Sequence, residues 1–437
     1  MTSKTRAATF AGLVAIAPAL SEAGVVDAKL LQMLQANGAI TKEQHAELLK
    51  DLERESRVAE RAERKADRAK LDKREFTAYQ QLAGWAANTR FTGDMRVRND
   101  YINIEDERKS AGRDKDRQRL RARLGVVTQV NPEVELGIQL ASGNSADRRS
   151  TNQDMDGYFD KKALWLDLGY IDYHPLAVPG LKLFGGKMKQ PWLSVGDVAW
   201  DGDINPEGFA AQYVRKSGTN TLTTSASYLV LKDNVDGDGV EWDNDLGVYT
   251  AQLAYAFDPN DSMRLTLGAS LNAFNNEEQQ LPSPPELVVG LRGNGNTTDA
   301  FSLVEGFGQL DVIGLPLPLT LYGQYVVNRD ARDFSTFSDG GEDTAWLFGF
   351  RTNIAGIMLD YNYRDVERNA VVGNLTDSDF AAGYVGSSGH KLKAQYDFLK
   401  NFNLTVTWMP SQSDAASRLL PDDADVETLM IDLNARF

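Results

Sequence analysis

The feature that most restricts the fold is a two-residue alternation, which is clearest in the stretch Arg117 to Val130. Arginine occupies every second position from Arg117 to Arg123, and Leu120, Ala122 and Leu124 lie in the intervening positions. Successive side chains of a β-strand point to opposite faces, so this pattern predicts a strand with guanidinium groups on one face and apolar groups on the other. One such strand fits both a soluble sheet and a barrel.

The same alternation continues from Asn88 to the end of the chain. Further segments with this period begin at the following residues: Phe91, Val134, Met263, Ile357 and Phe402. Counting such segments predicts about sixteen strands, each near the length that a tilted membrane-spanning strand requires.

The connections between these segments alternate between short and long. The short ones resemble turns, as at Asn131-Pro132 and 354–356, whereas the long ones include 143–161 and 189–207. A soluble sandwich has no reason to keep its long loops at one end, whereas a transmembrane barrel has short periplasmic turns and long outer loops. The sequence therefore predicts an all-β fold, a transmembrane antiparallel β-barrel of about sixteen strands.

Aromatic residues support this topology because amphipathic rings prefer the two bilayer interfaces. Outward aromatic positions at the periplasmic strand ends are Phe91, Phe257, Phe398, Phe402 and Phe437. Those at the outer strand ends are Tyr101, Tyr249, Tyr363 and Trp408. The two groups predict two girdles around the barrel, with outer-membrane lipid as its surroundings.

The first 23 residues predict an export signal peptide. Lys4 and Arg6 form a positive region, residues 7–20 form an apolar region, and Ala23 ends a small-residue cleavage site. A buried helix or membrane anchor is the alternative, but the apolar run is short. The predicted organisation is a signal peptide at 1–23, a periplasmic helical segment at 24–86 and an outer-membrane β-barrel at 87–437.

The helical segment at 24–86 contains a capping box formed by Thr41 and Gln44, which begins a helix that we expect to end at about Lys73. Its heptad seam is mostly alanine, comprising Leu48, Leu52, Glu55, Ala59, Ala62, Ala66 and Ala69. We interpret this seam as a thin coiled coil that helps three copies to assemble. A solvated charged helix without a partner is the alternative.

The composition excludes several classes of function. The chain has 437 residues, a net charge of -15 and no cysteine. A phosphate backbone is bound by clustered lysine and arginine, so this balance argues against a nucleic-acid partner. The absence of cysteine excludes disulfides and thiolate metal sites.

Three further segments carry a resemblance to a known family: Gly93–Arg98 (GDMRVR), Arg117–Gly125 (RQRLRARLG) and Trp200–Gly208 (WDGDINPEG). Together with the preceding segment LLQMLQANGAITKEQHAELL, they resemble the bacterial outer-membrane putative porin family over nearly the whole mature chain. The resemblance implies an outer-membrane porin, a passive diffusion channel for small hydrophilic solutes or ions. By similarity to general diffusion porins it also implies a homotrimer, and it indicates no particular solute.

A barrel of about sixteen strands is too wide for its own side chains to fill, so a loop has to narrow the channel. The loop Lys189–Glu207 occupies the position at which general porins fold a loop into the lumen. It carries four acidic residues: Asp197, Asp201, Asp203 and Glu207. We expect them to face the inward arginines of the first two strands: Arg96, Arg98, Arg117, Arg119, Arg121 and Arg123.

Opposed rows of charge would set up a transverse field that orients polar solutes in a pore constriction. In the alternative, the arginines pair with strand carboxylates such as Asp94, Glu133 and Asp167 and only stiffen the wall.

Other functions receive weaker support. The helix could tether the outer membrane to peptidoglycan, with the barrel as an anchor. His390 follows Ser387 and Ser388, but adjacency in sequence does not demonstrate an activated nucleophile, so we predict no catalytic site and no enzyme activity. The acidic loop Asp233 to Asp245 could gather Ca²⁺, although a solvated loop is the simpler interpretation. We predict no metal site and no cofactor.

Overall fold

The structure is a computed structural model that describes residues 29–105, 114–232, 246–275, 291, 293–331, 342–416 and 423–437. The chain divides into two compact units, Met1–Ala86 and Ala87–Phe437. The predicted signal peptide and the acidic loop 233–245 lie outside the described residues.

The first unit is helical. Residues 29–36 form a short helix, and α2 runs from Lys42 to Ala87. The predicted capping box is confirmed, because the Gln44 N–H donates to Thr41 Oγ1 (3.2 Å) and the Thr41 N–H donates to Gln44 Oε1 (2.9 Å). The expected end at about Lys73 was wrong, because α2 continues to Ala87. The helix therefore extends beyond Ala69, the last residue of the heptad seam. No described helix combines the length and apolar character needed to cross a bilayer.

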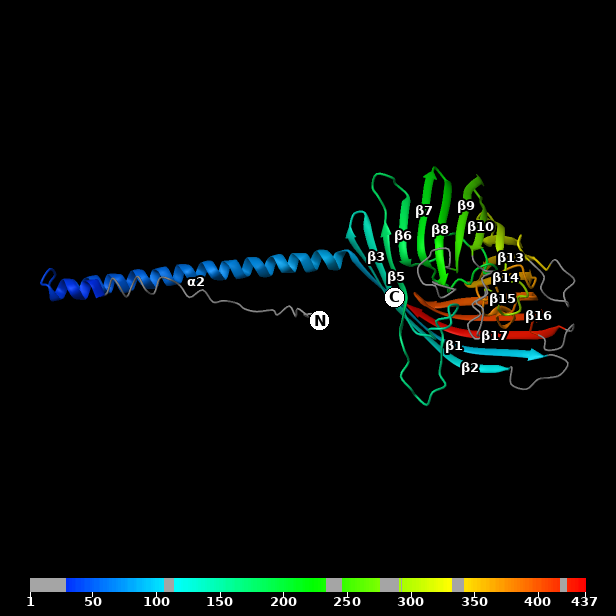
Figure 1. The fold of residues 1–437 in the computed structure, drawn as a ribbon, viewed down its shortest axis with the longest axis horizontal. Helices are drawn as coiled ribbons and strands as arrows, with labels where there is room; N and C mark the ends of the chain where they lie inside the picture. The colour runs from blue at the N-terminus through cyan, green and yellow to red at the C-terminus, as the bar shows by residue number, and fades with distance from the viewer. Residues whose placement is uncertain are drawn as a thin grey trace, which may run out of the picture. The chain divides into compact units, whose positions relative to one another are not determined.

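The second unit is a closed antiparallel barrel (Figure 1). Its strands are β1 Thr89–Glu105, β2 Lys115–Asn131, β3 Val134–Ala141, β4 Gln153–Asp154, β5 Trp165–Tyr173, β6 Leu181–Lys187, β7 Glu207–Ser217, β8 Asn220–Lys232, β9 Leu246–Asn260, β10 Met263–Asn275, β11 Ser302–Val312, β12 Leu319–Asn328, β13 Thr344–Ile354, β14 Ile357–Val366, β15 Ser387–Leu399, β16 Phe402–Ser413 and β17 Ala424–Arg436. The 3-10 helix η3 spans Phe380–Gly383.

Closure occurs where the first strand pairs with the last. In the register of this pair, Asp94 lies opposite Arg436 and Glu105 lies opposite Asp425. Each strand pairs with its neighbour in sequence, except that the two-residue β4 pairs only with β2 and β3 pairs directly with β5. Sixteen of the described strands therefore make up the wall, and the predicted fold is confirmed.

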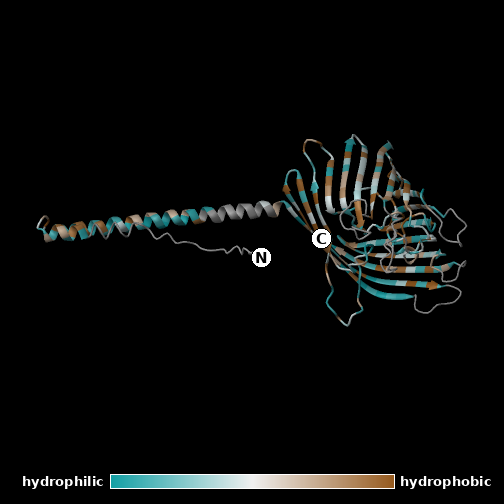
Figure 2. Ribbon diagram, in the orientation of Figure 1, coloured by the Kyte–Doolittle hydropathy of each residue, from teal (hydrophilic) through white to brown (hydrophobic). Residues whose placement is uncertain are grey.

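The alternation places charge inside and apolar groups outside, as expected. On β2, Leu124 is 49% exposed on the outer surface, whereas Arg121 is 6% exposed on the inner face. Apolar and polar residues alternate along the strands in Figure 2. The outward aromatic residues Phe91, Tyr249 and Trp408 are also exposed, as lipid-facing girdles require.

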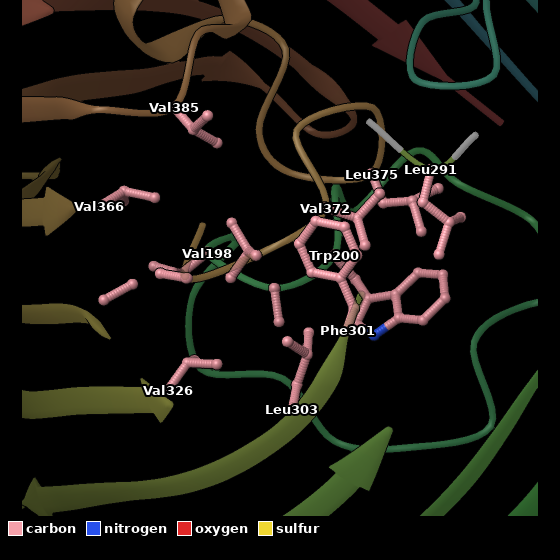
Figure 3. Close-up of a cluster of buried hydrophobic side chains, with 14 of the residues drawn as sticks. Val198, Trp200, Leu291, Phe301, Leu303, Val326, Val366, Val372, Leu375 and Val385 are labelled. Atoms are coloured by element: carbon pink, nitrogen blue, oxygen red, sulfur yellow. The ribbon is translucent and has the colours of Figure 1, made fainter. Parts of the chain in front are cut away.

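A large apolar cluster lies against the inner face of β8 to β14 (Figure 3). It joins inward wall residues with residues of the connections 188–206 and 367–386, and its members include Val198, Trp200, Phe301, Leu303, Val326, Val372 and Leu375. Such packing fixes the two connections, because undocking them would expose the buried side chains to water. This cluster determines which part of the lumen stays open.

Candidate pore constriction

The connection 188–206 crosses the lumen and is held by the wall. Gln252 on β9 accepts a hydrogen bond from the Leu193 N–H and donates to the Leu193 carbonyl oxygen, both at 2.8 Å. Gln212 on β7 donates to the Pro191 carbonyl oxygen at 2.7 Å. The side chains of inward polar wall residues thus replace the water that the backbone of this loop would otherwise bind.

Trp200 anchors the same loop in the apolar cluster. It is 5% exposed, packs against Trp192 with ring centroids 5.2 Å apart and stacks on Phe274 at 6.5 Å. Its indole N–H donates to Asn272 Oδ1 at 3.3 Å. The loop therefore has a rigid attachment on the side opposite the arginine strands.

A second connection, 367–386, meets the first inside the barrel. The Asp201 N–H donates to the Leu375 carbonyl oxygen (2.6 Å), and the Thr376 hydroxyl donates to the Val198 carbonyl oxygen (2.6 Å). The Ser378 N–H donates to Asp201 Oδ2 at 2.9 Å. Sequence reasoning missed this partner, since nothing in residues 367–386 alone indicates that they fold inward.

Beside the two loops lies a polar cavity of about 650 Å³, bounded by β1, β2 and β15 to β17. Its cationic lining residues are Arg96, Arg98, Arg121, Arg123, Arg149, Lys391, Lys393 and Arg436. Its acidic lining residues are Asp94, Asp197, Asp201, Asp203, Asp377, Asp379 and Asp432. Seven of the ten residues predicted for the constriction thus line one cavity, the exceptions being Arg117, Arg119 and Glu207.

Four arginines of the cavity wall are paired with carboxylates: Arg96, Arg98, Arg121 and Arg123. Arg121 Nη2 and Arg123 Nε lie 2.8 Å and 2.6 Å from the two oxygens of Asp94. Arg98, whose side chain is 4% exposed, lies 2.6 Å from Asp432 and 3.3 Å from Asp379. Burying these charges is tolerable because each guanidinium keeps a hydrogen-bonded partner.

The three predicted residues outside the cavity also have partners. Arg117 and Arg119 both pair with Asp100, and Arg119 Nε lies 2.7 Å from Asp154. Glu207 pairs with Lys187 at 2.7 Å. These residues connect β1, β2 and β4, or β6 and β7, so they brace the wall.

The alternative interpretation of the arginines as wall braces holds in part. Asp94 does pair with arginines, as that interpretation expects. Among the described residues Glu133 and Asp167 form no ion pair with arginine: Glu133 accepts from the Leu176 N–H, and Asp167 accepts from Gln139 and Asn205.

The three acidic loop residues differ in environment. Asp197 lies 3.3 Å from Lys391, and Asp203 lies 3.7 Å from Arg123 across the cavity. Asp201 is 7% exposed and accepts from the backbone N–H groups of Asp203 and Ser378. Burial and the nearby Asp377 carboxylate raise the pKa of Asp201 to about 8, so this side chain is mostly neutral at pH 7.

Asp377 is ionised in spite of its burial. Burial alone would raise its pKa, but Lys391 at 2.9 Å and Arg364 at 3.0 Å hold the pKa of Asp377 below its usual range. This buried cluster links β14 and β15 to the connection 367–386. The signal that could have found Lys391 and Lys393 is the alternation along β15, which places both on the inner face.

His390 lies at the outer surface of β15. Its Nδ1 lies 2.9 Å from the Tyr361 hydroxyl, and its ring packs edge-on against Tyr363 with centroids 5.0 Å apart. Among the described residues no serine hydroxyl forms a hydrogen bond with it, since Ser387 donates to the Tyr384 carbonyl oxygen. His390 therefore belongs to the aromatic surface of the barrel.

A closed barrel of sixteen strands, with loops folded inward beside a charged cavity, is the architecture of a bacterial porin. The family model described as "Putative porin" matches residues 108–302 and 357–437. The chain belongs to this family, which confirms the resemblance found in the sequence, and it is an outer-membrane porin channel. No curated protein matches the chain.

Solved bacterial porins are similar in fold. OprB from Pseudomonas putida is 10% identical, with a TM-score of 0.51, over 83% of this chain and 96% of that one. OmpF from Salmonella typhi is 12% identical, with a TM-score of 0.47, over 80% of this chain and 97% of that one. A mutant porin of Rhodopseudomonas blastica is 13% identical, with a TM-score of 0.44, over 79% of this chain and 99% of that one. Of these three structures, OprB has a TM-score above 0.5 and therefore supports the assignment of the fold.

Proposed function

We propose that the chain is a passive diffusion channel for small hydrophilic solutes or ions, and that the charged cavity is its constriction. The observation that carries this proposal is the placement of loop carboxylates and wall arginines around one polar cavity of about 650 Å³. A cavity of this size admits small hydrated solutes. Rings of charged side chains are a common means of selection in channels.

The constriction that we propose omits three of the ten residues predicted from the sequence and adds four others. Arg96, Arg98, Arg121 and Arg123 would form its wall side, with Asp197, Asp201 and Asp203 on the loop side. Asp377 and Asp379 extend the loop side, and Lys391 and Lys393 extend the wall side. Arg117, Arg119 and Glu207 would act as braces.

Deleting residues 194–203 tests the constriction. The loop would no longer cross the lumen, so we expect single-channel conductance in planar bilayers to rise. Deleting 156–160 is the matched control, because that stretch does not line the cavity and should leave the conductance near that of the unaltered chain. A folded barrel with the loop deletion and unchanged conductance would contradict the proposed constriction.

We propose that α2 lies in the periplasm and assembles as a coiled coil in a homotrimer. Leu48 is 44% exposed in the single chain, and the seam alanines from Ala59 to Ala69 are exposed as well. An apolar seam open along the helix is what a partner helix would cover. The alanines bury little area, so the contact would be weak without the barrel.

A tether to peptidoglycan is the second proposal for α2. Its 46 residues span about 70 Å at 1.5 Å per residue, which is long enough to reach well away from a membrane surface. Truncating residues 24–86 separates the roles. A pore keeps its conductance, a trimerisation helix lowers the stability of the trimer in detergent, and a tether loses cell-wall association.

A further inference from the structure

We propose that this channel prefers anions, although the whole chain carries a net charge of -15. The inference rests on the proposed pore and specifies the class of solute: inorganic anions and small carboxylate-bearing molecules. It depends on which charges in the cavity are already neutralised by a partner and which are not.

The ionised carboxylates of the lining all have a cationic partner. Asp94 and Asp432 are each held by arginine at 2.6 Å, and Asp377 lies 2.9 Å from Lys391. The remaining loop carboxylates have longer contacts, with Asp379 at 3.3 Å from Arg98, Asp197 at 3.3 Å from Lys391 and Asp203 at 3.7 Å from Arg123. A passing cation would have to compete with these fixed partners.

Asp201 is the acidic lining residue without a cationic partner among the described residues. Its two oxygens accept from backbone N–H groups at 2.8 Å and 2.9 Å. Its raised pKa keeps it mostly neutral at pH 7, so it adds little negative charge to the path. The acidic side of the cavity is therefore largely neutralised.

Three cations of the lining, Lys393, Arg149 and Arg436, have no such partner among the described residues. Lys393 projects from the inner face of β15, and its register neighbour Asp360 on β14 is already bonded to Arg351 and Tyr322. Within the described part of the chain, no carboxylate oxygen lies within 4 Å of the Lys393 ammonium. Lys393 therefore lines the cavity without a direct ion pair to a described carboxylate.

Arg149 is the second cation. Its Nη1 donates to the carbonyl oxygens of Gly373 at 2.9 Å and Thr376 at 3.2 Å. These bonds fix the guanidinium at the cavity but do not neutralise it, and it also has no carboxylate oxygen within 4 Å in the described part of the chain. The loop 142–164 and β15 thus each supply to one cavity a positive charge that no described carboxylate contacts directly.

Fixed charge that is not held in a direct ion pair raises the local concentration of the oppositely charged ion. Lysine and arginine act in this way in anion-conducting pores. The net charge of the chain has little influence here, because charges separated from the path by more than the Debye length of about 8 Å are screened at physiological salt.

The test is the reversal potential of the full-length chain in planar bilayers under a KCl gradient at pH 7. We expect a chloride-to-potassium permeability ratio above one. Arg149→Gln and Lys393→Gln should each lower it about sevenfold, since one charge about 7 Å from the path in water stabilises an anion by about one RT and destabilises a cation by the same amount. The charge-conserving variants Arg149→Lys and Lys393→Arg should retain the preference, and Lys216→Gln, at the exposed end of β7, is the control outside the cavity.

The outcomes separate the two proposals. Channels that prefer potassium, or Gln variants that match the Lys216→Gln control, would overturn the anion preference and leave the pore intact. A folded barrel that produces no channels would overturn the proposed diffusion function, and the anion preference with it.

Discussion

Replacing Trp200 with alanine should release the loop that we propose narrows the channel. Trp200 is 5% exposed, lies between Trp192 and Phe274, and donates to Asn272. The substitution removes this apolar contact and its hydrogen bond but leaves every charge of the cavity in place. It therefore separates the position of the loop from its electrostatics.

The magnitude follows from the burial of the indole. A Trp→Ala change at a buried site costs about 3–5 kcal/mol. If this cost falls on loop docking, the ratio of undocked to docked loop rises about 10²- to 4 × 10³-fold, because each 1.4 kcal/mol is a factor of ten. A loop that is undocked once in about a thousand observations would then be undocked for a substantial share of the time.

Single-channel recording measures this directly. We expect Trp200→Ala channels to show a higher mean conductance with added noise as the loop leaves and returns. Trp346→Ala is the matched control, because Trp346 is 39% exposed on the outer face of β13 and touches no part of the lumen loops. A folded Trp200→Ala barrel with the conductance and noise of the control would refute the anchoring role of the indole.

Two further predictions concern buried carboxylates. Because the pKa of Asp201 is raised to about 8, the folded chain holds a proton between about pH 4 and 8 that the unfolded chain releases, so stability should fall as pH rises through this window. Above pH 8 Asp201 adds a negative charge to those of Asp147 and Asp377 near Arg149, so the anion preference should fall across pH 7 to 9 in reversal-potential measurements. Asp201→Asn should remove that step. Separately, Asp432→Asn leaves Arg98 without its close ionic partner. This substitution should lower the free energy of unfolding by about 3 kcal/mol in urea titrations of the barrel in lipid vesicles. Arg98→Met combined with Asp432→Leu should recover most of the lost stability. Equal stability of the single and double variants would contradict this account.

The barrel could be predicted from the sequence because its cause is local. Alternation along Arg117 to Val130 depends only on the geometry of one strand, and the lengths of connections depend only on neighbouring strands. The arginine row follows from the same local pattern, whereas the loop acids were predicted from the resemblance of the loop 189–207 to the inward loop of general porins. Seven of the ten predicted constriction residues therefore line one cavity in the structure.

The partners of these residues could not be predicted, because they come from distant parts of the chain. Asp379 contacts Arg98, which lies 281 positions earlier in the chain, and the Ser378 N–H donates to Asp201, which lies 177 positions earlier. Arg149 belongs to a loop whose sequence gives no sign of entering the lumen. Such contacts depend on closure of the barrel, which brings β1 and β17 together.

Closure alone does not explain why the cavity lies beside β1, β2 and β15 to β17. The inner face is not uniformly polar: Leu229, Val248, Leu303 and Val326 point inward near the strand ends that carry long connections. Water-filled space against these side chains would be unfavourable, and apolar residues of the loops cover them instead. Docking there draws the connections 188–206 and 367–386 across the lumen and leaves their acidic residues facing the arginines. The path that we propose for solutes thus depends on where the wall is apolar as much as on where it is charged. Replacing Leu303 with a polar residue should therefore alter conductance, although this substitution moves no charge.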